Sequence, residues 1–187
     1  NILGIHDIQL SKARDVYLYP ADGLLVVKKN RDFLFNGHIY AGSGRLNLYG
    51  KNFYFHYDEF KIDLEKIDSI QLSVPIRPIK KDDHENEILT VVKTVIEAGT
   101  GNLRIDDPTN KSGLRKDSFP KFPIFRSFEY SYAYYDKKTI YNGVYNKDNF
   151  FFHLQPFEIA NVDDFTGEKL AFAGTFESSG IFPSFDD

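Results

Sequence analysis

Apolar and polar residues alternate along much of the first half of the chain. The alternation is regular over 32–40, 45–49 and 52–64, where apolar side chains recur at every second position. Side chains at every second position lie on the same face of a β-strand, because successive Cβ atoms project to opposite sides of the pleated backbone. In the most regular stretch, Phe53 lies on one face and His56 on the other. The pattern therefore predicts strands with one buried face and one wet face.

Shorter runs of the same kind predict further strands along the rest of the chain. Turn-forming Gly, Pro, Asn and Asp residues separate these runs. Residues 88–98 also fit a helical stripe, but their many β-branched side chains favour a strand, so we predict at most one short helix there. We therefore predict an all-β fold of many short strands in an extended or solenoid-like repetitive sheet. The additional predicted strands are 5–10, 15–19, 24–27, 103–105 and 128–135.

One sequence motif occurs twice in the chain. Asn-Phe-Tyr-Phe-His at 52–56 is matched by Asn-Phe-Phe-Phe-His at 149–153, which is 97 positions later (150 minus 53). Chance self-similarity in a Phe-rich chain is the alternative explanation. If the repeat is real, two repeat-like halves, about 32–74 and 140–177, are joined by a loop-rich middle and stack to bury a shared core. We predict that 1–187 is one continuous β-rich segment of a larger protein.

The composition strengthens the β prediction and excludes several functions. The chain has 18 Phe and 12 Tyr but no Trp, Met or Cys, and aromatic residues are enriched in strands. A net charge of −4 with interspersed acids and bases provides no basic face, so we predict no nucleic-acid partner. The apolar runs are only a few residues long, so we predict no transmembrane helix. Without Cys, disulfides and thiolate metal sites are excluded.

Candidate catalytic and metal-binding residues are few. Asp106, Asp107 and Asn110 lie in the loop best suited to an oxygen-only cation site, but we favour turn capping because the spaced ligands of a calcium loop are missing. His56 and His153 occupy equivalent motif positions and could hold a metal across neighbouring strands. A zinc site usually needs three or four ligands, so we favour packing roles. The sequence contains no nucleophile elbow, zinc-binding helix motif or phosphate loop. We therefore predict no catalytic residue, no metal and no cofactor, and expect a protein that is not an enzyme.

The candidate binding residues are a run of alternating tyrosines. Tyr130, Tyr132 and Tyr134 fall on one face of the predicted strand 128–135. A tyrosine offers an apolar ring with a polar tip, so such a row can stack on sugar rings or on a partner protein. The alternative, which we favour, is that the three rings pack one face of a sheet, as aromatic residues often do in β cores.

Two groups of residues carry a resemblance to a class of bacterial proteins. The first group is 172–176 with 179–183, and the second is 103–108, 110–113 and 123–125. These segments resemble internal parts of very long, uncharacterised envelope-associated proteins of Bacteroidetes bacteria. The resemblance covers most of the chain. It implies a large parent protein at the bacterial cell envelope or cell surface, and it implies no activity and no catalytic residue.

These observations together predict a structural role. We expect a non-catalytic structural or assembly segment of a large bacterial cell-envelope protein, whose partners are neighbouring segments of the same long chain or other envelope proteins. The expected mechanism is mechanical, because open sheet edges can continue into neighbouring strands. A carbohydrate-binding β-sandwich module that uses exposed tyrosines, with a glycan as its partner, is the first alternative. A hydrolase with an Asp/His site is the second.

Overall fold

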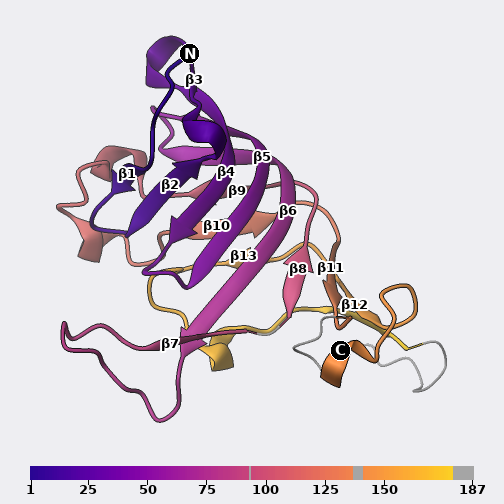
Figure 1. The fold of residues 1–187 in the computed structure, drawn as a ribbon. Helices are drawn as coiled ribbons and strands as arrows, with labels where there is room; N and C mark the ends of the chain where they lie inside the picture. The colour runs from indigo at the N-terminus through magenta and orange to yellow at the C-terminus, as the bar shows by residue number, and fades with distance from the viewer. Residues whose placement is uncertain (93, 137–140, 179–187) are drawn as a thin grey trace.

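The computed structural model of the chain describes residues 1–92, 94–136 and 141–178, and it is all-β, as the sequence predicts (Figure 1). The helices in these ranges are 3-10 turns of three residues, and none has the length and apolar character that crossing a bilayer takes. Residues 88–98 contribute strands β7 and β8, in agreement with the strand prediction. The strands are β1 (Ile8–Ser11), β2 (Val16–Pro20), β3 (Val26–Val27), β4 (Phe33–Ala41), β5 (Leu46–His56), β6 (Lys61–Pro75), β7 (Leu89–Val91), β8 (Val95–Glu97), β9 (Gly101–Arg104), β10 (Ile124–Ser127), β11 (Ser131–Tyr134), β12 (Phe151–Leu154), β13 (Glu158–Ile159) and β14 (Gly174–Glu177).

These strands join one large antiparallel sheet, which is open. Its main path runs β1–β2–β4–β5–β6–β8–β11–β12–β14. Strand β6 is the branch point, because β5 pairs along one of its edges while β9, β8 and β7 share the other edge in turn. A second branch, β9–β10–β13, therefore leaves the sheet at the start of β6. Solenoid-like repetition of this sheet stays a prediction.

The second branch folds across one face of the main sheet. Figure 1 shows β9, β10 and β13 behind the strands β4, β5 and β6. Two buried arginines confirm the contact: Nη1 of Arg14 donates to the carbonyl of Phe122, just before β10, at 3.0 Å. Nε of Arg45 donates to the carbonyl of Phe165, which follows β13, at 3.2 Å. The core between the two layers includes Leu18, Ile39, Leu48, Phe53, Ile62, Leu103 and Phe125.

The alternation of apolar and polar residues determines which side chains enter this core. Phe53 and Phe55 of β5 are buried, whereas Tyr54 and His56 point to the opposite side and are partly exposed. We call the side turned toward the core the inner face of the sheet and the opposite side the outer face. Burying one phenylalanine ring contributes about 1.5–3 kcal/mol, so the two phenylalanines make the motif a strand of the core.

Each copy of the motif lies on the middle strand of three neighbouring antiparallel strands. The first copy is on β5, between β4 and β6, and the second overlaps β12, between β11 and β14. The strands differ in length, since β5 has 11 residues and β12 has 4. The repeat and the division into two halves therefore stay predictions. Residue 140 of the second half, and residues 179–183 of the resemblance, lie outside the described residues.

A buried ion pair holds the β1–β2 turn against the second layer. Nε of Arg14 lies 2.8 Å from Oδ2 of Asp106, which follows β9, and Nη1 lies 3.5 Å from Oδ2 of Asp163. Nη2 of the same arginine donates to the carbonyl of Phe119 at 2.7 Å. One side chain thus contacts three segments of the chain that are remote from it in sequence, and these contacts close one end of the core.

Candidate functional site

Strand β11 carries the predicted row of tyrosines on its outer face. Tyr132 and Tyr134 project outward, while Ser131 and Ala133 are buried on the inner face. Tyr130, immediately before the strand, is 55% exposed, and Tyr132 is 36% exposed. These rings therefore lie on an accessible surface of the sheet and not between its two layers.

The neighbouring strand β12 adds two more rings to this surface. The register pairs Tyr132 with His153 and Tyr134 with Phe151. The imidazole of His153 stacks on the ring of Tyr132, with centroids 4.8 Å and planes 16° apart. It packs at a tilt against the ring of Tyr130, with centroids 4.6 Å and planes 31° apart. The rings of Tyr132 and Tyr134 are 10° from parallel, with centroids 6.0 Å apart. We call these five residues the tyrosine surface.

An ion pair borders the tyrosine surface. Nζ of Lys147 lies 2.9 Å from Oε1 of Glu97, on the adjacent strand β8, and 4.1 Å from the centroid of the Tyr134 ring. Burial raises the pKa of Tyr134, an effect that Lys147 opposes and Glu97 reinforces. The hydrogen bond to Glu97 raises the pKa of Lys147. At neutral pH the phenol of Tyr134 is therefore neutral and the amino group of Lys147 is positively charged.

Sequence reasoning finds the three tyrosines but misses the residues that complete the surface. It assigns His153 a packing role and does not single out Phe151, Glu97 or Lys147. The alternation in the second motif copy does place Phe151 and His153 on one face of a strand. Their pairing with the tyrosines depends on strand order and register, which no local pattern specifies.

The two histidines of the repeated motif are not brought together. His56 lies on β5 and His153 on β12, and strands β6, β8 and β11 separate them. Nε2 of His56 lies 2.7 Å from Oδ2 of Asp63, and its ring packs on Tyr54 with centroids 4.5 Å apart. Because strands of a sheet are about 4.8 Å apart, this order places the two histidines too far apart to share a metal ion.

The acidic loop after β9 stabilises the fold through its hydrogen bonds. Oδ2 of Asp106 accepts from Nε of Arg14 at 2.8 Å and from Nδ2 of Asn110 at 3.1 Å. Oδ1 of Asp107 caps the next turn by accepting from the hydroxyl and the backbone N–H of Thr109, and these hydrogen bonds lower the pKa of Asp107. Within the part of the chain that the structure describes, no group of three or more His, Cys, Asp or Glu side chains is arranged to hold a metal ion.

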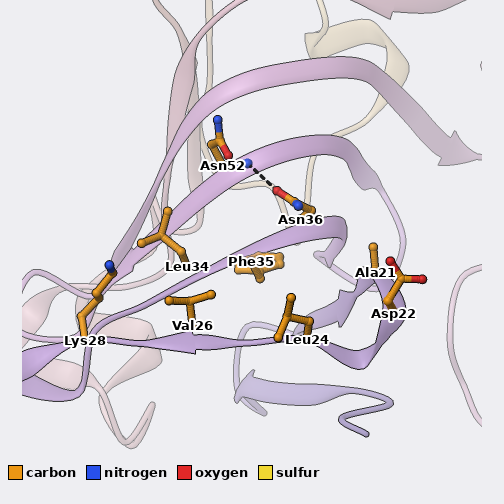
Figure 2. A pocket seen from close by; sticks show the side chains of 9 residues that line it. All are labelled: Ala21, Asp22, Leu24, Val26, Lys28, Leu34, Phe35, Asn36 and Asn52. Carbon is orange, nitrogen blue, oxygen red and sulfur yellow. Dashed lines mark hydrogen bonds between the residues drawn. The ribbon is translucent and has the colours of Figure 1, made fainter. Parts of the chain in front are cut away.

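A cavity of about 290 Å³ lies at the end of the sheet where β3 pairs with β4. Figure 2 shows the side chains that line it. The backbone N–H of Asn52 donates to Oδ1 of Asn36 at 2.9 Å, and the ring of Phe35 lies inside the rim. Asp22 is the carboxylate among its lining residues, so the cavity lacks the facing pair that a glycosidase needs. Its lining residues are Ala21, Asp22, Leu24, Val26, Lys28, Leu34, Phe35, Asn36 and Asn52.

A second, more polar cavity of about 490 Å³ gathers carboxylates near Arg45. Arg45 forms an ion pair with Glu87, and hydrogen bonds from the backbone and side chain of Asn86 help to lower the pKa of Asp82. A general acid of a glycosidase needs the opposite shift, toward a raised pKa. Neither of these two cavities is lined by a histidine, so neither offers the Asp/His site of a hydrolase. The carboxylates of the second cavity are Asp15, Asp82, Glu87 and Asp164.

Comparison of the chain with protein-family models, with curated proteins and with solved structures finds no match.

Proposed function

We propose that this chain is a non-catalytic carbohydrate-binding β module that stacks sugar rings on the tyrosine surface. One observation carries the proposal: partly exposed aromatic rings, held near parallel by mutual stacking, stand on the open outer face of the sheet. The C–H groups on the faces of a sugar ring are apolar and slightly positive, whereas the face of an aromatic ring is negative. The two therefore attract each other, and a tyrosine adds a hydroxyl for hydrogen bonding.

The surroundings of the tyrosine surface support this proposal in two ways. The ring of His153 already packs against one face of Tyr130 and one face of Tyr132, so a sugar stacks on their other faces. The same contacts hold the tyrosines in place, so they lose little conformational freedom when a ligand binds. Glu97 and Lys147 place a charged acceptor and a charged donor beside Tyr134, within reach of sugar hydroxyls. Apolar rings with a few polar groups at their margin are typical of small-molecule binding sites.

We expect Tyr132→Ala to weaken glycan binding about 30-fold, because truncating a central aromatic anchor costs about 2 kcal/mol. Binding is measured first on a glycan array and then by calorimetry with an oligosaccharide that the parent protein retains. Tyr54→Ala is the matched control: it removes a tyrosine from the outer face of β5, where the ring packs on His56. This control should bind as the parent does.

Two results would overturn the carbohydrate proposal. One is the failure of the parent protein to retain any glycan, and the other is equal binding by the parent and Tyr132→Ala. Thermal unfolding followed by circular dichroism distinguishes lost binding from lost folding. Because the Tyr132 ring is partly exposed, its removal should shift the melting temperature only slightly.

A structural or assembly role in the bacterial cell envelope is the second candidate, and the open sheet favours it. Within the described residues, β1 lies at one end of the main path and pairs along a single edge, with β2. The unpaired edge of a β-strand is a template for a strand of another segment or partner. We therefore expect the purified chain to associate as its concentration rises in sedimentation-velocity experiments. A monomer at every concentration would contradict this role.

A further inference from the structure

A second group of stacked rings lies on the outer face of the main sheet, away from the tyrosine surface. Tyr19 of β2, His38 of β4 and Tyr49 of β5 are paired across these strands by the register. The rings of His38 and Tyr49 have centroids 4.3 Å and planes 6° apart, and those of Tyr19 and His38 are 5.3 Å and 19° apart. Tyr19 is 40% exposed and Tyr49 is 39% exposed. We call these three residues the second aromatic cluster.

Hydrogen bonds hold the central ring of this cluster in place. Nδ2 of Asn47 donates to the carbonyl of Gly44 at 3.0 Å, so its Oδ1 is left as an acceptor for Nε2 of His38 at 2.8 Å. Burial lowers the pKa of His38, and this effect outweighs the hydrogen bond with Asn47, which raises the pKa. The imidazole is therefore neutral at neutral pH, with its proton on Nε2, and it stacks between two tyrosines as the His153 ring stacks on Tyr130 and Tyr132.

The two groups of rings lie on one row that crosses the sheet. Tyr49 pairs with Ser69, and Tyr132 pairs with Glu97. The bridge between Ile70 and Ile96 sets Ser69 opposite Glu97, because the strands are antiparallel. The row reads Tyr19, His38, Tyr49, Ser69, Glu97, Tyr132 and His153. Three strand intervals separate Tyr49 from Tyr132, which corresponds to about 14 Å in a sheet.

The positions between the two groups suit the hydroxyls of a sugar chain. Ser69 and Glu97 occupy the row there, and both offer polar groups on the outer face. The sheet twists by about 20–25° per strand, so the two groups are rotated against each other by about 60–75° over three intervals. A flat crystalline polysaccharide cannot contact both groups at once, whereas a single dissolved chain can follow the twist. The net charge of −4 disfavours polyanionic glycans.

We propose that the second aromatic cluster is a second sugar-stacking site, and that the two sites together bind one soluble, neutral polysaccharide chain running across the strands from β2 to β12. This inference rests on the proposed carbohydrate function of the tyrosine surface. Two linked sites of this kind bind a polymer more tightly than either site binds a short oligosaccharide, because the second contact is intramolecular.

The test compares polymers with short sugars in variants of each site. Affinity gel electrophoresis uses xyloglucan, galactomannan, mixed-linkage β-glucan and soluble starch, and calorimetry uses short oligosaccharides of whichever polymer retards the parent protein. We expect Tyr49→Ala to weaken polymer binding about tenfold or more. It should also lower the number of short oligosaccharides bound per protein from two toward one, while the affinity of the tyrosine surface for them stays the same. Tyr49→Phe keeps the ring and should bind as the parent does. Tyr54→Ala, on the same strand and face but outside the row, is the matched control.

Each outcome separates this inference from the function on which it rests. Equal polymer binding by Tyr49→Ala and the parent would overturn the second site. Weaker sugar binding by Tyr132→Ala in the same experiment would leave the proposed function of the tyrosine surface intact. Tyr19→Ala repeats the test on another strand if Tyr49→Ala does not fold. If no soluble polymer retards the parent, or if it binds microcrystalline cellulose as tightly as the dissolved chains, the extended site is wrong. If the parent binds no sugar of any length, the carbohydrate function itself fails.

Discussion

An Arg14→Ala variant is expected to lose about 3–5 kcal/mol of unfolding free energy, which is typical for removal of one partner of a buried ion pair. The side chain of Arg14 is 1% exposed and that of Asp106 is fully buried. The variant leaves this carboxylate without its arginine and removes a donor from the carbonyls of Lys116, Phe119 and Phe122. A buried charge without a partner costs more than the intact pair contributes, so the effect is large.

Urea unfolding followed by circular dichroism measures this loss. Arg77→Ala is the matched control, because Arg77 forms an exposed ion pair with Glu168 at 3.0 Å, and such pairs contribute about 0–1 kcal/mol. The double variant Arg14→Met with Asp106→Leu removes both charges and should recover part of the stability. It also keeps the test informative if the single variant does not fold. Equal unfolding midpoints for Arg14→Ala and Arg77→Ala would show that the pair does not hold the layers together.

A Phe53→Ala variant is expected to lose about 3–5 kcal/mol, the range found when a buried aromatic ring is replaced by alanine. Phe53 is 0% exposed on the inner face of β5, and its ring contacts that of Phe35 with centroids 5.4 Å apart. The substitution removes the ring from the centre of the core and leaves a cavity that the surrounding strands fill only in part. The loss is measured by the same urea unfolding experiment.

The neighbouring residue on the opposite face provides the control for Phe53. Tyr54 is partly exposed on the outer face, so Tyr54→Ala should cost clearly less than Phe53→Ala. Phe152, the inner-face residue of the second motif copy, is only partly buried. We therefore expect Phe152→Ala to lose less unfolding free energy than Phe53→Ala and more than Tyr54→Ala. A loss in Phe53→Ala no greater than in Tyr54→Ala would mean that the assignment of the two faces is wrong.

Local alternation predicts the all-β fold here because the strands of the main sheet have one buried and one open face. The stretch 52–64 illustrates this, since Phe53 and Ile62 enter the core while His56 does not. The same reasoning places Tyr132 and Tyr134 on one face of a strand, and the structure has them there. Each of these features depends only on residues two positions apart, which the sequence displays directly.

Pairing between remote strands is what the local pattern does not contain. Arg14 meets Asp106 across 92 positions of sequence, and no periodicity links the two. Tyr132 stacks on His153 only because β11 and β12 are neighbours in a particular register, and a shift by one residue would place the histidine on the inner face. The tyrosines of the candidate site could therefore be predicted from the sequence. The residues that hold these rings in place and those that lie beside them could not.

Strand β6 makes the two branches of the sheet energetically interdependent. It pairs with β5 along one edge and divides the other edge among β9, β8 and β7. A fluctuation that detaches either branch strips hydrogen bonds from the same backbone and opens its edge to water. We therefore expect damage to one branch to lower the stability of the other, so that the described part of the chain unfolds as one cooperative unit despite its branched sheet.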